Sequence, residues 1–297
     1  MPQDNDLIKF PRTVTVMQVA KAFPVLDGEY RIPHSLTQAQ QYAGKEGFVF
    51  TSEDLIRARI DLVKTQGKKA TNHPFLDKWY TVLTEECRIG NDILVFQGGF
   101  VFNEPKRIKQ ALDKGLVEGA GKYMGGEITL LKEGIGKGRI PDTNIQVINY
   151  VDFKKLSEKD ILGLLKHYGV VLSIKEATQL SSGYHDLSSL VRNPLFTVRS
   201  GGIEQANEHV ETLSKLGAES FGNYHNFIDG AGRLLYVRYN FNGGFGCYSH
   251  LDGDARFVGV DQSAEGASPE ILPVKPDITM EIAALRELAS NLEALCK

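Results

Sequence analysis

Strand-like and helix-like periodicities coexist along this chain, and this combination restricts its fold more than any other feature. Residues 79–86 alternate between apolar and polar side chains, a Gly-Asn turn follows at 90–91, and 93–96 returns as an apolar strand. This pattern predicts a β-hairpin. Turn residues also separate three later apolar segments, which predict a C-terminal antiparallel β-meander: 233–241, 245–251 and 255–260.

Helix-start signals recur between the predicted strands. In each, a Ser or Thr stands three residues before an acid or amide, which permits a capping box. The four sites are Ser35–Gln38, Thr51–Asp54, Ser157–Asp160 and Ser173–Glu176. Glycines end the second helix at Gly67 and the third at Gly169, and a further helix starts at Asn103-Glu104-Pro105 and ends near Gly115.

Shorter strands are expected at 145–151, 170–172 and 195–199, each next to a helix, and a helix is expected from Ile203 to Leu216. Hairpins that coexist with strand–helix units are typical of an α+β fold. We therefore predict a mixed β-sheet with flanking helices, the C-terminal β-meander and a terminal amphipathic helix.

Glycine- and proline-rich stretches suggest how the chain is divided. The Gly- and Lys-rich stretch 115–141 predicts a mobile connection, and its GIGKGR sequence at 134–139 predicts a flexible loop. An N-terminal α+β region, 1–141, would then precede a C-terminal α+β region, 142–267, although 297 residues can also form a single large domain. A proline-containing linker leads to a helix at 277–297, whose heptad-like apolar seam would pack on its own domain or on a second copy.

Charge and composition exclude several classes of function. Lys and Arg number 34 against 37 Asp and Glu, so the chain lacks the concentrated basic field of most nucleic-acid-binding proteins. No apolar run approaches the ~18 residues of a membrane span, and the N-terminal sequence has no apolar signal core. Three widely spaced cysteines are typical of a reduced compartment. We expect a soluble cytoplasmic protein.

Familiar catalytic signatures are absent from the sequence. It contains no G-x-S-x-G elbow, H-E-x-x-H helix, C-x-x-C pair or spaced dinucleotide fingerprint. Glu85 and Glu86 adjoin in a predicted strand, so their carboxylates should point to opposite faces and cannot act on one substrate together.

The glycine pair at 201–202 suggests a ligand site. It would connect the predicted strand 195–199 to a helix, so that Gly201 and Gly202 would offer N–H groups at a positive helix end and Arg199 would add a charge. This pattern suits a small anionic molecule. The alternative is an ordinary turn in which glycine permits a positive φ.

Histidine, cysteine, tyrosine and aspartate gather in the C-terminal half of the sequence. The candidate catalytic residues there are His185, Asp186, His225, Cys247 and His250. A histidine could act as a general base near neutral pH, and Cys247 as a nucleophile. Cys247 and His250 would face opposite sides of a flat strand, so they could share a zinc ion only across a bulge, and we predict no metal site. The histidines could equally be structural, and no cofactor follows from the sequence.

Two functional hypotheses remain. The first is an enzyme that binds a small anionic molecule near Arg199–Gly202 and His185. The second is a non-catalytic interaction or assembly protein that forms a homo-oligomer through residues 277–297.

Overall fold

The computed structural model describes residues 7–11, 17–25, 31–45, 47–164, 167–238, 243–246 and 251–261. The described residues all belong to one compact unit that ends at Glu265. The predicted helix at 277–297, the nucleophile Cys247 and the candidate His250 lie outside the described residues.

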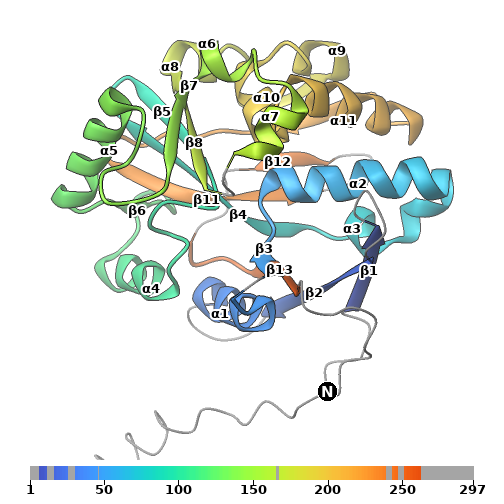
Figure 1. Cartoon of the computed structure of the whole chain (residues 1–297), viewed down its shortest axis with the longest axis horizontal. Coiled ribbons are helices and arrows are strands. Elements are labelled where there is room, and N and C mark those ends of the chain that lie inside the picture. Colours follow the sequence, from blue (N-terminus) through green and yellow to red (C-terminus); the bar gives the residue numbers. More distant parts are fainter. Residues whose placement is uncertain are drawn as a thin grey trace, which may run out of the picture. The chain divides into compact units, whose positions relative to one another are not determined.

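A nine-stranded mixed sheet organises this unit (Figure 1). Its strands lie in the order β7 (Gln146–Asn149), β8 (Tyr168–Ser173), β5 (Asp92–Gln97), β4 (Tyr80–Ile89), β11 (Ala231–Arg238), β12 (Gly244–Gly246), β10 (Ser220–Asn223) and β9 (Gly183–Asp186), with β6 (Gly121–Lys122) beside β11. The β7–β8 and β10–β12 pairs are parallel, and the remaining pairs are antiparallel. The predicted hairpin is confirmed as β4 and β5, and two of the short predicted strands as β7 and β8.

A second, four-stranded antiparallel sheet lies in the same unit. Its order is β1 (Leu7–Pro11), β2 (Met17–Val25), β13 (Ala255–Asp261) and β3 (Phe48–Val49). The predicted meander is therefore only partly correct. β11 and β12 do pair, but the third strand, β13, leaves them to pair with β2 and β3. Its partners come from the start of the chain, which local alternation does not reveal.

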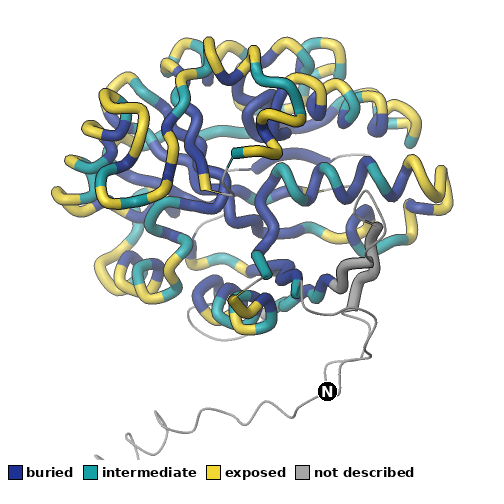
Figure 2. Tube along the Cα trace, viewed as in Figure 1, coloured by how far each residue is buried: buried dark blue, intermediate teal, exposed yellow. Residues whose placement is uncertain are grey.

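Helices cover both sheets. They are α1 (Arg31–Ala43), α2 (Ser52–Gln66), η1 (Gly67–Asn72), α3 (Pro74–Asp77), α4 (Pro105–Lys114), α5 (Gly125–Lys137), α6 (Tyr150–Phe153), α7 (Glu158–Gly163), α8 (Ile174–Ala177), α9 (Leu187–Leu190), α10 (Pro194–Ser200) and α11 (Ile203–Lys215). No helix in the described part of the chain is long and apolar enough to cross a membrane. Figure 2 shows that burial follows the strands, whereas the outer turns of α4 and α5 are exposed.

The capping signals predicted three helix starts correctly. Thr51, Ser157 and Ser173 each form the expected capping box. Ser35 does not start a helix, because it lies inside α1 and its hydroxyl donates to the Phe23 carbonyl. The helix after Ser157 ends at Gly163 and not at Gly169, since the chain then enters β8 between β5 and β7.

Two other predictions are wrong. The segment 195–199 is not a strand but the helix α10, which Asn193 caps through a bond from the Phe196 N–H and which Pro194 opens. The stretch 115–141 is not a mobile connection, because it contains β6 and the thirteen-residue helix α5, and the GIGKGR sequence ends that helix with Gly138 in a left-handed conformation. Both flanks of this stretch belong to the same compact unit, so the expected division at 141 is not seen.

Candidate binding surface

Arg199 is fully buried and its guanidinium is occupied by the protein itself. Nε and Nη2 donate to the two carboxylate oxygens of Glu86 at 2.6 and 2.7 Å. Nη1 donates to Asn223 Oδ1 at 2.7 Å and Nη2 to the Tyr224 carbonyl at 2.9 Å. Such a bidentate, charge-assisted pair holds elements together. Arg199 therefore ties β10 to β4 and is not available to a ligand.

The glycine pair at 201–202 forms a compact joint between α10 and α11. Gly201 N–H donates to the Val198 carbonyl and Gly202 N–H to the Thr197 carbonyl. Both glycines have positive φ, 87° and 116°, and a Cβ on Gly201 would lie 2.4 Å from Cγ of Glu53. The N–H groups are used and a carboxylate side chain packs against the turn, so the predicted anion site is not formed here.

Glu53 is itself an unusual group. Its carboxylate accepts from the Tyr168 hydroxyl at 2.8 Å and from Arg57 Nη2 at 3.0 Å. Burial raises the pKa of Glu53 to about 7, against the opposing effect of Arg57. The carboxylate joins α2 to β8 and the α10–α11 joint.

Glu85 and Glu86 point to opposite faces of the sheet, as the sequence predicts. Glu86 meets Arg199, whereas Oε2 of Glu85 accepts three consecutive backbone N–H groups, those of 100–102, at 2.6, 2.9 and 2.9 Å. Burial raises the pKa of Glu85 against these hydrogen bonds. Each carboxylate thus fixes a loop or a helix to β4.

His185 and His225 hold one segment in place. His185 Nε2 lies 2.7 Å from the Ser181 carbonyl oxygen and His225 Nε2 lies 3.0 Å from the Leu180 carbonyl oxygen. Burial lowers the pKa of His225, which favours a neutral ring at pH 7. The structure brings these two predicted residues together, and both use their rings to fix the chain just before β9.

Asp186 caps the short helix α9. Its carboxylate accepts from the Ser189 N–H and from the hydroxyls of Ser188 and Ser189, and these bonds hold its pKa well below the usual range. Among the described residues, no group of three or more His, Cys, Asp and Glu side chains could hold a metal ion.

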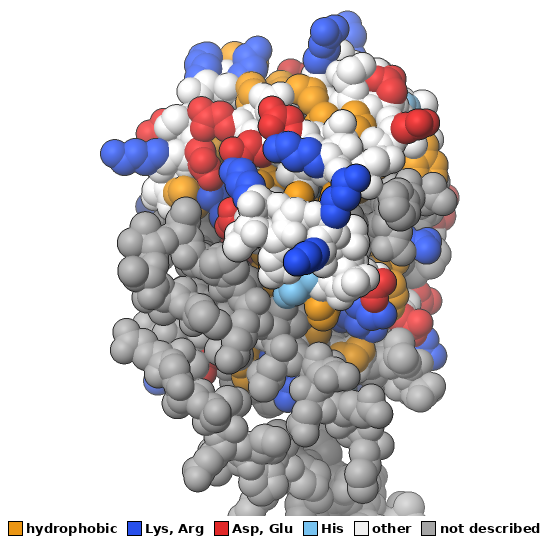
Figure 3. Space-filling view, turned by 90° about the vertical axis from the view of Figure 1, so that its right-hand side faces the viewer, with side chains coloured by type: hydrophobic (Ala, Val, Ile, Leu, Met, Phe, Trp, Pro, Cys, Tyr) orange, Lys and Arg blue, Asp and Glu red, His pale blue; other side chains and the backbone are white. Residues whose placement is uncertain are grey.

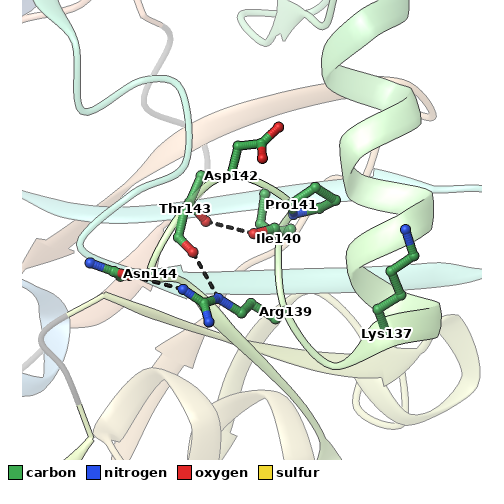
Figure 4. Close-up of a pocket in the computed structure, with 7 residues that line it drawn as sticks. All are labelled: Lys137, Arg139, Ile140, Pro141, Asp142, Thr143 and Asn144. Carbon is green, nitrogen blue, oxygen red and sulfur yellow. Dashed lines mark hydrogen bonds between the residues drawn. The ribbon is translucent and has the colours of Figure 1, made fainter.

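Two surface depressions lie away from the predicted site residues. One, of about 670 Å³, is formed by Lys137 and the loop 139–144, where Arg139 donates to the Thr143 carbonyl and the Asn144 side chain (Figure 4). The other, of about 430 Å³, lies near the start of α2 and includes Asp54 and His167. Neither includes Arg199, His185 or His225.

Strand register places a different set of side chains on one face of the large sheet. Tyr184 pairs with Gly222, Gly222 with Gly244, and Gly244 with Arg238. Paired residues project to the same face, and so do residues two apart along a strand. The row runs across β9, β10, β12 and β11, a distance of roughly 14 Å at ~4.8 Å per strand.

Aromatic contacts extend this row at both ends. The rings of Tyr184 and Tyr224 pack edge to face with centroids 5.5 Å apart. At the other end, the ring of Tyr236 lies 5.3 Å from that of Trp79, and the guanidinium of Arg256 lies 5.5 Å from the Trp79 ring. We call this set the tyrosine face: Trp79, Tyr184, Tyr224, Tyr236, Arg238 and Arg256.

Glycines form the floor between these side chains. A Cβ on Gly222 would lie 2.6 Å from the Tyr224 ring, and one on Gly246 would lie 3.4 Å from the Tyr236 ring. The absence of side chains lets the two tyrosine rings lie close to the strands. Neither depression described above includes a residue of the tyrosine face.

Exposure and charge distinguish the tyrosine face from the buried core. Tyr184 is 48% exposed, Arg238 is also exposed, and the other four members are partly exposed. Arg238 and Arg256 make no hydrogen bond or ion pair with any residue that the structure describes, and of the Arg256 guanidinium the Nε atom is buried. Such guanidinium groups can bind a partner.

The predicted residues support this face from behind. Arg199 bonds the Tyr224 carbonyl, and His185 and His225 fix the segment that leads to Tyr184. Sequence reasoning found these supporting residues because the histidines cluster with Tyr, Cys and Asp, and because Arg199 comes just before the glycine pair. It missed Trp79, Tyr236, Arg238 and Arg256, whose only local signal is alternation within predicted strands.

The fold is similar to a known one. One solved structure matches this chain with a TM-score of 0.57 and 22% identity. Its description reads "Accommodation of massive sequence variation in Nanoarchaeota by the C-type lectin fold". The match covers 82% of this chain and 98% of the other. This chain therefore has an α+β fold of the C-type lectin type. No family model and no curated protein matches it.

Proposed function

We propose that this chain is a binding protein that recognises the surface of another protein through its tyrosine face. The observation that carries the proposal is the convergence of four aromatic residues and two arginines, which lie in or directly beside separate strands, on one partly exposed face. Trp, Tyr and Arg are the residue types that dominate binding energy at protein interfaces. Aromatic rings supply contact area at a low cost in conformational entropy.

The sequence beside the tyrosine face supports the same function. The tetrapeptides Tyr-Asn-Phe-Asn at 239–242 and Cys-Tyr-Ser-His at 247–250 come directly before and after the segment 243–246 that contains β12. Tyr, Ser, Gly and Asn are the residues most enriched in antibody binding loops, because they combine rigid contact area with adaptable hydrogen bonding. The composition of these segments suits recognition better than catalysis.

The scaffold suits a surface whose side chains can change. The buried network of Glu86, Arg199 and Asn223 and the histidine bonds to 180–181 fix the backbone from the opposite face. The similar structure is described as a C-type lectin fold that accommodates massive sequence variation. We propose that the tyrosine face is the surface that varies in this chain, since its exposed side chains contribute little to the core.

The enzyme hypothesis loses support from the same contacts. His185, His225, Asp186 and Arg199 all take part in internal hydrogen bonds that explain their presence. The assembly hypothesis, a homo-oligomer formed through 277–297, remains a prediction because that segment lies outside the described residues.

Selection from a random-peptide library against the intact chain tests the proposal. Peptides enriched on the wild-type chain should bind at least about tenfold more weakly to the Tyr184→Ser/Trp79→Ala double variant, because truncation of interface aromatics costs about 2 kcal/mol or more. The control is Leu162→Ser, which removes an exposed apolar side chain from α7 and should leave binding unchanged. Peptides that bind the double variant as well as the wild type would refute the assignment.

A further inference from the structure

We infer that the Arg238–Arg256 end of the tyrosine face binds an acidic segment of the partner, one in which several Asp or Glu carboxylates lie close together. This inference rests on the proposed function and specifies the partner's chemistry. It follows from two guanidinium groups that share one face and that make no hydrogen bond or ion pair with described residues.

Arg256 is positioned by an aromatic ring, and its Nε is buried without a hydrogen-bond partner. Its guanidinium lies over the Trp79 ring, and Trp79 also contacts the ring of Tyr236. A guanidinium that stacks on an aromatic ring keeps its N–H groups in the plane of the fork, where a carboxylate can accept two bonds. Because the ring already restricts the arginine, less side-chain entropy is lost on binding.

Arg238 and Tyr236 extend the site along β11. Arg238 lies two residues beyond Tyr236 at the end of the strand, so the two side chains project to the same face. Burial raises the pKa of Tyr236 against the lowering effect of Arg238, Arg256 and Arg59, so its hydroxyl stays protonated at neutral pH. The end of the face thus combines two cations with an O–H group able to donate.

A protein segment fits this surface better than a nucleic acid. Single-stranded nucleic acids need a continuous basic groove that follows many phosphates, whereas the cations of the tyrosine face are confined to its β11–β13 end. At the other end Asp186 lies two residues from Tyr184 on the same strand and would repel a long polyanion. Among the described residues on the side of the molecule shown in Figure 3, acidic and basic side chains are mixed.

Trp79 is the only tryptophan in the chain, so its fluorescence reports directly on this site. The full-length protein is titrated with hexaglutamate, with hexaglutamine of the same length, and with a ten-nucleotide oligothymidine. Hexaglutamate should change the Trp79 fluorescence saturably and bind at least about tenfold more tightly than hexaglutamine, and the binding should weaken as salt increases. Oligothymidine should bind more weakly than hexaglutamate.

Single substitutions identify the residues that bind hexaglutamate. Arg256→Gln and Arg238→Gln should each weaken hexaglutamate binding about tenfold, and Arg256→Lys should weaken it less, because charge remains without the planar fork. Arg192→Gln, which removes an exposed arginine between α9 and α10, is the control and should bind like the wild type. Arg238 is exposed, so its variant still tests the inference if the Arg256 variant fails to fold.

Three results would overturn the inference. They are equal binding of hexaglutamate and hexaglutamine, tighter binding of oligothymidine, or hexaglutamate binding that survives both arginine substitutions. The proposed function would stand in each case if library peptides still depended on Tyr184 and Trp79. If binding of the library peptides did not depend on Tyr184 and Trp79, the proposed function itself would be refuted.

Discussion

Glu53 is a buried carboxylate whose protonation should couple to folding. Its pKa is raised to about 7 in the folded protein, above the ordinary value of 4.5, so the fold favours the protonated form. The stability that this preference gives is present below about pH 4.5 and is lost as the pH rises through 7. At pH 8, ionisation of Glu53 therefore lowers the free energy of unfolding by roughly 3 kcal/mol relative to pH 4, because each pKa unit corresponds to ~1.4 kcal/mol.

Glu53→Gln should therefore be more stable than the wild type at pH 8 and nearly equal to it at pH 4. Glutamine cannot ionise, and its side-chain oxygen can still accept from the Tyr168 hydroxyl. Urea unfolding of both proteins between pH 4 and pH 8 measures the difference. A wild type that is the more stable protein at pH 8 would contradict this account.

Arg199 provides a second prediction at the level of single residues. Arg199→Met leaves the buried Glu86 carboxylate without its cation, which should cost about 3–5 kcal/mol of unfolding free energy. The double variant Glu86→Leu/Arg199→Met should recover most of this loss, because the uncompensated charge is gone. Urea unfolding of the three proteins tests this, and a single variant that loses less than ~1 kcal/mol would show that the pair is not coupled as described.

The unusual residues could be identified from the sequence, but their roles could not. Arg199, His185 and His225 are conspicuous in an otherwise ordinary composition, and the structure gives each a specific contact. Those contacts come from Glu86 and from 180–181, and no local pattern indicates such partners. Tyrosines and arginines on alternating strand positions are common, so only strand pairing reveals the tyrosine face.

Among the elements, β12 depends on glycine for its close pairing with β10. A Cβ on Gly244 would lie 2.9 Å from the backbone Cα of Gly222, so Gly244→Ala must push β12 and β10 apart. Such overpacking should cost about 1–3 kcal/mol. Gly136→Ala is the matched control, because its Cβ meets nothing within 4 Å on α5 and alanine favours a helix by up to ~1 kcal/mol. Thermal unfolding measures the melting temperatures of the two variants. Equal melting temperatures would show that β10 and β12 are not closely paired.

Elements defined by local chemistry were predictable, and elements defined by distant partners were not. Capping boxes at Thr51, Ser157 and Ser173 involve residues three apart, so the sequence alone locates these helix starts. The Leu-Phe-Thr-Val-Arg sequence of α10 has strand-like composition, but the Asn193 cap and Pro194 start a helix that tertiary packing then buries. Here capping outweighs intrinsic strand preference.

At the scale of the whole molecule, two sheets share one compact unit. β13 follows β12 in sequence, yet pairs with β2 from the opposite end of the chain, and Arg256 on β13 still reaches Trp79 beside the large sheet. The α+β class could be predicted because it needs only the mixture of periodicities. The division into two sheets depends on which distant strands pair, and a single sequence contains no local signal for that choice.

The whole molecule should tolerate changes on the tyrosine face that it does not tolerate in the core behind it. Tyr184→Ser and Arg238→Ser replace exposed side chains, so each should shift stability by no more than ~0.5 kcal/mol and the melting temperature by roughly 2 °C or less. Phe245→Ala, on the opposite face of β12 and fully buried among aromatic rings, should cost about 3–5 kcal/mol. Thermal unfolding of the three variants compares them directly. Equal losses at both faces would mean that the tyrosine face belongs to the structural core, and a surface of that kind could not vary without loss of the fold.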